Sequence, residues 1–255
     1  MSLFRLIARL DIKGRNVVKG IQMEGLRVVG EPAEMAQRYA EGGADELLYI
    51  DTVASLYGRN QLEALLEKTV ESVFVPVTVG GGIASVSDAR RLFNAGADKI
   101  AVNTAALKRR ELIDELAGKF GNQAVVVSIE AKRVNGGWEC YSDNGRSPSG
   151  ISATAWALEA VKRGAGELLL TSIDRDGTRR GFDTDLVAAI APNVSVPVTA
   201  SGGMGCAEHL KEVVKRGRAD AVAIASVLHY GKCSIQELRS VVSRGTGSYV
   251  KGVAL

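Results

Sequence analysis

The chain contains one block of sequence twice, and this duplication constrains its fold more than any other feature. The first copy, residues 75–104, reads VPVTVGGGIASVSDARRLFNAGADKIAVNT, and the second, residues 196–226, reads VPVTASGGMGCAEHLKEVVKRGRADAVAIAS. Each copy has an apolar run, a glycine turn, an amphipathic stretch and a second apolar run. The copies start about 120 residues apart, roughly half the chain. We therefore predict a protein built from two similar halves.

Apolar runs typical of buried strands alternate along the chain with amphipathic stretches of helical spacing. The runs are Leu6–Ile12, Glu46–Asp51, Val75–Val79, Lys99–Val102, Ala124–Glu130, Glu167–Ser172, Val196–Ala200 and Ala221–Ala225. The helical stretches are Glu34–Glu41, Gln61–Ser72, Ser87–Asn94, Arg110–Lys119, Thr154–Arg163, Asp183–Ala191, Glu208–Arg216 and Ile235–Ser243. Such alternation indicates a parallel sheet with helical crossovers.

Eight strand–helix units in a chain of this length are typical of the TIM barrel. We therefore predict the α/β class, with a single (β/α)8 TIM barrel domain over residues 1–255 made of two duplicated (β/α)4 halves. An open doubly wound sheet is the alternative. The duplication and the absence of a GxGxxG turn disfavour it.

The bulk composition excludes several functional classes. A formal net charge of +3 does not favour nucleic-acid or membrane binding, so we expect neither partner. The three cysteines, Cys140, Cys206 and Cys233, have no metal or redox spacing. The N-terminal apolar run contains Arg5 and Arg9, which predicts a buried strand rather than a signal peptide. We expect a cytoplasmic protein without a metal or an organic cofactor.

Candidate binding residues follow from the strand ends, because the active site of a TIM barrel lies where strands end and βα loops begin. Glycine pairs and small polar residues there can surround an anion with N–H groups and hydroxyls. We predict one phosphate site from each half and hence a substrate with two phosphates. The predicted substrate residues are Asp51, Gly81, Gly82, Asn103, Thr104, Thr171, Asp176, Gly177, Ser201, Gly202, Gly203, Ala225 and Ser226.

Two carboxyls end equivalent strands of the two halves. Asp11 ends the first predicted strand and Glu130 the fifth, and these strands face each other across an eight-stranded barrel. A carboxyl on either side of the middle of a substrate can work as an acid and a base. We predict Asp11 and Glu130 as the catalytic residues.

These residues carry a resemblance to a known family. The chain resembles the cyclase subunit of imidazole glycerol phosphate synthase, or a close paralogue, along essentially its whole length. The matching stretches are LDIKGRNVVKG, GADELLYID, VTVGGGI, GADKIAVNTAA, FGNQAVVVSIEAKRV, RGAGELLLTSIDRDGT, ASGGMG and ASV. The resemblance implies a cyclase of histidine biosynthesis, in which ammonia attacks a phosphoribulosyl formimino aminoimidazole carboxamide ribotide. Ring closure would give imidazole glycerol phosphate and release aminoimidazole carboxamide ribotide.

The resemblance also implies a partner. Ammonia would come from a glutaminase docked at the N-terminal face of the barrel, through a gate of four charged residues: Arg5, Glu46, Lys99 and Glu167. Lys19, in the glycine-bearing loop from Lys13 to Gly30, matches a family lysine on a mobile loop that covers substrate. The excursion Val134–Gly150 is either a hairpin lid or a plain surface loop.

Two departures from the family concern its catalytic carboxylates and their surroundings. Its second catalytic carboxylate is an aspartate where this chain has Glu130, and the extra methylene moves the carboxyl by about 1.5 Å. A displacement of about 1 Å can cost a hundredfold in rate. The family usually has a small residue where this chain has Arg9, which should point into the barrel with Asp11. A buried guanidinium needs a carboxylate, and Glu130 and Asp11 are the candidates. Our hypothesis is an ion pair across the barrel between Arg9 and Glu130.

These departures keep other interpretations open. One is a paralogous ammonia-channelling subunit of an amidotransferase that forms amidino groups on surface-polysaccharide sugars. Another is a non-catalytic activator of the glutaminase. The single-chain isomerase of the same pathway, which uses no ammonia, is disfavoured by the complete gate.

Overall fold

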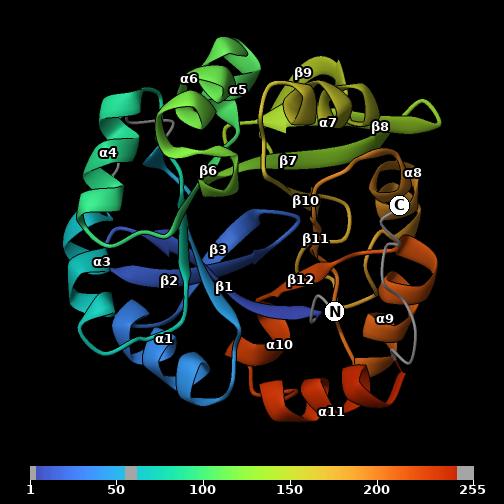
Figure 1. Cartoon of the computed structure of the whole chain (residues 1–255). Coiled ribbons are helices and arrows are strands. Elements are labelled where there is room, and N and C mark those ends of the chain that lie inside the picture. Colours follow the sequence, from blue (N-terminus) through green and yellow to red (C-terminus); the bar gives the residue numbers. More distant parts are fainter. Residues whose placement is uncertain (1–3, 55–61, 246–255) are drawn as a thin grey trace, which may run out of the picture.

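Eight parallel strands close into a barrel surrounded by helices (Figure 1). The computed structural model describes residues 4–54 and 62–245. β12 pairs with β1 and β7 pairs with β10, which closes the sheet on itself. The predicted (β/α)8 TIM barrel is therefore confirmed. Its strands are β1 (Arg5–Lys13), β4 (Glu46–Asp51), β5 (Val77–Gly80), β6 (Lys99–Val102), β7 (Val125–Val134), β10 (Glu167–Ser172), β11 (Val198–Ser201) and β12 (Ala221–Ile224).

The predicted helices are present, and most bounds shift by no more than two residues. The exception is Glu208–Arg216, where the α-helix ends at Glu212 and a π-helical turn, Val213–Gly217, follows. Several begin at a side-chain cap: Ser85 accepts a hydrogen bond from the Asp88 N–H at the start of α4, for example. Gln61 lies outside the described residues. The helices are α1 (Pro32–Glu41), α3 (Glu63–Val70), α4 (Val86–Asn94), α5 (Thr104–Lys108), α6 (Glu111–Phe120), α7 (Ala153–Lys162), α8 (Thr184–Ile190), α9 (Ala207–Glu212), α10 (Ser226–His229) and α11 (Ile235–Gly245). Among the described residues, no helix combines the length and the apolarity that a membrane span requires.

Two predicted strands start two residues later than expected. The runs from Val75 and Val196 enter the sheet only at Val77 and Val198. The residue before each start is an exposed proline, which has no N–H to donate to a neighbouring strand. The correction is the same in both halves.

The core has two layers, because side chains alternate along each barrel strand. On β1, Leu6, Ala8 and Leu10 pack outward against the helices. Ile7 belongs instead to the inner cluster that fills the barrel. Arg5, Arg9 and Asp11 share the parity of Ile7 and point inward, as predicted.

The first strand of each half leaves the barrel as a β-hairpin. β1 pairs with β2 (Asn16–Ile21), which pairs with β3 (Glu24–Gly30). β7 pairs in the same way with β8 (Gly137–Ser142), and β8 with β9 (Ser147–Ser152). The predicted loop from Lys13 to Gly30 is thus a hairpin, and of the two readings of Val134–Gly150 the hairpin is correct.

Candidate active site

The predicted catalytic carboxyls lie where β1 and β7 pass from the barrel into their hairpins. Asp11 stands opposite Val18 of β2, and Glu130 stands opposite Tyr141 of β8. Both carboxyls are buried. The duplication therefore puts one acid at the same point of each half.

Asp11 is held by two cations. Its Oδ1 accepts a hydrogen bond from Arg9 Nε at 2.8 Å, and its Oδ2 lies 3.3 Å from Lys19 Nζ. Burial alone raises the pKa of Asp11, but the charges of Arg9 and Lys19 outweigh it and lower that pKa to about 2. Asp11 is therefore a carboxylate at any ordinary pH.

The hypothesis that Arg9 pairs with Glu130 is wrong, because Arg9 pairs with Asp11 instead. Its Nη1 donates to Thr171 Oγ1 at 2.9 Å and to Ser201 Oγ at 3.1 Å. Asp11 lies two residues along the same strand, on the same face, so the guanidinium reaches it without crossing the barrel. Thr171 and Ser201, predicted to bind substrate, are thus engaged by Arg9.

Lys19 fastens the β2–β3 hairpin over the barrel mouth. Its Nζ lies 2.8 and 2.9 Å from the two carboxylate oxygens of Asp176, and all of these atoms are buried. The hairpin turn adds hydrogen bonds from the N–H groups of Gln22 and Met23 to Asp176. Gly177 lies under the hairpin, and a Cβ there would be 2.3 Å from the carbonyl oxygen of Gly20. Asp176 and Gly177, both predicted to bind substrate, thus contact the β2–β3 hairpin instead.

Glu130 has a different environment from Asp11. Its Oε2 accepts a hydrogen bond from the Gly145 N–H of the β8–β9 turn at 2.7 Å. Burial raises the pKa of Glu130 to about 7, against the opposing effects of Arg9 and of the Gly145 N–H. Glu130 can therefore gain or lose a proton near neutral pH.

A cavity of about 240 Å³ opens at the ends of β4 to β7. Glu130 lines it, together with residues of the first predicted phosphate site, whereas Asp11 does not. Asn103 Oδ1 is buried there without a hydrogen-bond partner among the described residues. The predicted site residues on this cavity are Asp51, Gly81, Gly82, Asn103, Thr104 and Glu130. Residues not predicted to belong to the site also line it, among them Ser128, Lys108 and Asn144.

The second predicted phosphate set repeats the backbone of the first but does not line this cavity. Ala225 has φ −126° and ψ −80°, close to the φ −133° and ψ −86° of Asn103. Gly202 and Gly203 have φ of +90° and +98°, and Ser226 begins α10. The two sets therefore have matching backbone geometry in the two halves.

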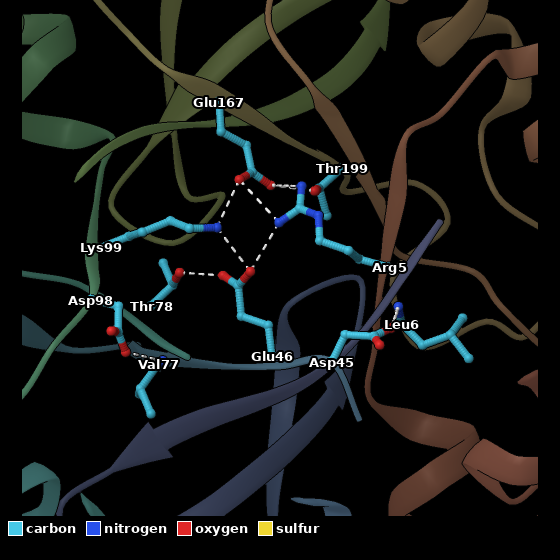
Figure 2. A network of polar contacts seen from close by, with 10 residues as sticks. All are labelled: Arg5, Leu6, Asp45, Glu46, Val77, Thr78, Asp98, Lys99, Glu167 and Thr199. Atoms are coloured by element: carbon cyan, nitrogen blue, oxygen red, sulfur yellow. Dashed lines mark hydrogen bonds and ion pairs between the residues drawn. The ribbon is translucent and has the colours of Figure 1, made fainter. Parts of the chain in front are cut away.

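The four predicted gate residues form a closed ring at the opposite end of the barrel (Figure 2). Arg5 contacts Glu46 at 2.9 Å and Glu167 at 2.8 Å, and Lys99 contacts the same two carboxylates at 2.8 and 3.0 Å. A threonine hydroxyl, which the sequence analysis did not single out, donates to each carboxylate: Thr78 to Glu46 and Thr199 to Glu167.

Comparison with known proteins decides the family. A family model described as histidine biosynthesis protein matches residues 5–234. This chain belongs to that family. The match spans all eight barrel strands, both hairpins and the gate ring.

Two curated family members are similar over most of the chain. One is the imidazole glycerol phosphate synthase subunit HisF of Legionella pneumophila, 60% identical over 206 residues, which are 80% of this chain and 97% of the relative. The other is the protein of the same name from Acidobacterium capsulatum, 50% identical over 236 residues, which are 92% and 93% of the two chains.

Proposed function

We propose that this family member is the cyclase subunit of an imidazole glycerol phosphate synthase, a lyase of histidine biosynthesis. It would use ammonia to convert the phosphoribulosyl formimino aminoimidazole carboxamide ribotide into imidazole glycerol phosphate and aminoimidazole carboxamide ribotide. The names of the two relatives, at 50–60% identity, support this activity. The proposed enzyme is cytoplasmic and consists of one domain.

The observation that carries the proposal is the position of Glu130 on a cavity that also holds the first predicted phosphate site. Addition of ammonia and closure of the imidazole ring both need a group that takes up and releases protons. Glu130 has a pKa of about 7 and faces the same cavity as Asn103 and the Gly81-Gly82 turn. We propose that this turn and the Asn103-Thr104 segment hold one phosphate, and that the Gly202-Gly203 turn with Ala225-Ser226 holds the other.

The ring at the other end supports an ammonia entrance. Arg5, Glu46, Lys99 and Glu167 span the interior of the barrel at the start of the strands. Each cation contacts both carboxylates. A passage through the ring therefore requires these ion pairs to break, but it does not require the backbone to move. We propose that a glutaminase docks on this face and that its binding opens the ring.

The experiment is ammonia-dependent turnover of the purified chain without a glutaminase, with loss of the ribulosyl substrate followed optically. We expect kcat near or above about 1 s⁻¹ for the unaltered chain. Glu130→Gln should lower kcat by a factor of about 10² to 10⁴, because it removes the proton-transferring group. Glu130→Asp moves the carboxyl by more than 1 Å and should cost about a hundredfold. The control is Glu67→Gln, an exposed carboxyl on α3, which should change nothing.

The departure at Arg9 makes a second candidate function specific enough to test. A chain that is inert at saturating ammonia but stimulates glutamine hydrolysis by the glutaminase is a subunit that activates its partner or supplies ammonia to another acceptor, such as a polysaccharide sugar. That pair of results contradicts the cyclase proposal.

A further inference from the structure

The two mouth carboxyls present different numbers of open oxygens to a ligand. Asp11 uses both: Oδ1 on Arg9 and Oδ2 on Lys19. Glu130 uses Oε2 on the Gly145 N–H, and its Oε1 has no hydrogen bond or ion pair within the described ranges. Glu130 also lines the cavity, and Asp11 does not. Of the two carboxyls, only Glu130 therefore offers an open oxygen to a ligand in the cavity.

Arg9 accounts for this difference. Its side chain is 4% exposed and is fixed at three points: Asp11, Thr171 and Ser201. A guanidinium keeps its charge at all relevant pH values and holds a rigid fork of donors. Once buried, such a cation requires a permanent anion beside it, because an unpaired charge in the interior costs several kcal/mol. Protonation of Asp11 would leave Arg9 without that anion.

We propose that Arg9 divides the work of the two carboxyls: it holds Asp11 as a permanent anion that positions Lys19, and it leaves Glu130 to exchange the proton with substrate. Arg9 is then a positioning residue for the reaction, although it does not line the cavity. This inference rests on the proposed cyclase function, since it assigns roles within that reaction.

The charged surroundings of the two carboxyls agree with this division. Asp11 faces Arg9 on its own strand, Lys19 from the β2–β3 hairpin and His229 from α10, and each of these groups favours its ionised form. The pair of cations outweighs burial. Asp176, the second partner of Lys19, keeps that lysine charged.

Glu130 faces one cation and two anions. Arg9 favours its ionised form, and so does the Gly145 N–H from the β8–β9 turn. Burial, Asp11 and Asp176 favour its protonated form. The balance leaves Glu130 titrating close to neutrality, because Arg9 is already committed to Asp11 at 2.8 Å.

The first test reads carboxyl protonation directly, by infrared difference spectroscopy between pH 5.5 and pH 8.5 without substrate. Ordinary carboxyls titrate below about pH 5, so the difference spectrum reports displaced ones. We expect one carboxylic acid band that disappears with a midpoint near pH 7. The band should be absent from Glu130→Gln. In Asp11→Asn its midpoint should fall, because this change removes a neighbouring anion and releases Arg9.

The second test removes the guanidinium. In Arg9→Met, a variant of similar length without charge, both carboxyls lose a cation, so the Glu130 midpoint should rise by about one unit or more. The pKa of Asp11 should rise as well, because Arg9 no longer lowers it. Arg9→Lys keeps a charge without the fork and should move the Glu130 midpoint less than Arg9→Met does. The rising limb of kcat/KM against pH should move with the infrared midpoint.

Two results would overturn the inference: a band that survives in Glu130→Gln, or a midpoint that does not fall in Asp11→Asn. Because the spectra need no substrate, the unaltered chain and these two variants decide it even if Arg9→Met does not fold. A chain without cyclase turnover that shows the Glu130 band contradicts the proposed function alone. An active cyclase whose band belongs to Asp11 contradicts this inference alone.

Discussion

At the scale of single residues, the mouth of this barrel joins two acids of the same chemical class and gives them opposite proton affinities. The pKa of Asp11 falls to about 2 and that of Glu130 rises to about 7, although both are buried. Burial favours the neutral form of each, and only Asp11 has two cations close enough to reverse this. The local partners, rather than the depth of burial, distinguish the two acids.

The raised pKa of Glu130 predicts a characteristic dependence of stability on pH. Between about pH 4.5 and 7 the folded chain binds a proton at Glu130 that the unfolded chain has released, so this group stabilises the fold at low pH and loses that effect as pH rises. A shift of this size corresponds to about 3 kcal/mol. Relative to the unaltered chain, Glu130→Gln should therefore gain about 3 kcal/mol in free energy of unfolding between pH 5 and pH 8.

Urea unfolding at several pH values measures this difference. The curve of the unaltered chain alone would mislead, because burial lowers the pKa of His229 to about 4, which makes stability rise with pH over part of the same range. Subtracting the curve of the unaltered chain from that of Glu130→Gln cancels the His229 contribution. A pH-independent difference would contradict the raised pKa.

Sequence alone predicted both acids but not the partner of Arg9. The repeat placed Asp11 and Glu130 at equivalent strand ends, and strand alternation placed Arg9 on the inner face with Asp11. Alternation gives the face of a side chain but not its rotamer, and a long guanidinium has two carboxyls within reach. Thr171 and Ser201 also hold the guanidinium, and their strands, β10 and β11, lie three and two places from β1 in the sheet, so these contacts exist only in the folded barrel.

At the scale of elements, the two glycine turns are required by close backbone approach and not only by the need to bend. Gly81 has φ +100°, and a Cβ there would lie 2.4 Å from the carbonyl oxygen of Asp51. Gly203 has φ +98°, and its Cβ would lie 2.1 Å from the carbonyl oxygen of Gly181. The turns thus pack against the neighbouring strand end or loop at a distance that excludes any side chain.

This geometry gives a matched pair of variants. Gly43 has φ +91° with nothing within 4 Å of a built Cβ, so Gly43→Ala should cost only the backbone strain, about 1 kcal/mol. Gly81→Ala adds a clash with backbone and should cost more than about 3 kcal/mol. Chemical denaturation measures both. Equal costs would show that the approach of the turn to Asp51 can relax.

The two hairpins differ in how clearly the local sequence marks their turns. A hairpin within Val134–Gly150 was foreseen as one of two readings, and the turn between β7 and β8 has Asn135 and Gly136 with positive φ, a common hairpin turn. The β2–β3 turn places Gln22 and Met23 at positive φ without glycine or asparagine, so no turn signal marks it. Its hydrogen bonds to Asp176 stabilise the turn instead, and they exist only once the barrel has formed.

At the scale of the whole molecule, the twofold repeat extends to the gate carboxylates but not to the gate cations. Glu46 with Thr78 and Glu167 with Thr199 occupy equivalent strands of the two halves. Arg5 on β1 is unmatched, because the register of the two halves makes Ala124, just before β7, its equivalent. Two carboxylates related by the repeat, Glu46 and Glu167, are therefore bridged by two cations that the repeat does not relate. Loss of either cation removes one ion pair from each carboxylate.

The ring predicts a linked effect on stability and on ammonia use. Lys99→Met should lower the free energy of unfolding by about 1 to 3 kcal/mol, because Glu46 and Glu167 each lose a charged hydrogen bond in a largely buried site. With the proposed glutaminase bound, turnover supported by glutamine should fall relative to turnover supported by free ammonia, since a gap in the ring lets ammonia exchange with solvent.

Lys68→Met is the control, because Lys68 is exposed on α3. Thermal unfolding and the ratio of the two turnover rates test the prediction. A Lys99→Met variant with an unaltered ratio would contradict a role of the ring in ammonia transfer.

The hydrogen bond from the Gly145 N–H to Glu130 has a consequence for how this site could change over generations. The donor belongs to the turn of the β8–β9 hairpin, whereas the acid belongs to the barrel wall. A hairpin of another length or sequence would remove the Gly145 N–H from Glu130 or change its direction, with every barrel residue unchanged. The proton affinity of the acid can therefore drift with an exchangeable surface loop, independently of the selection that preserves the barrel.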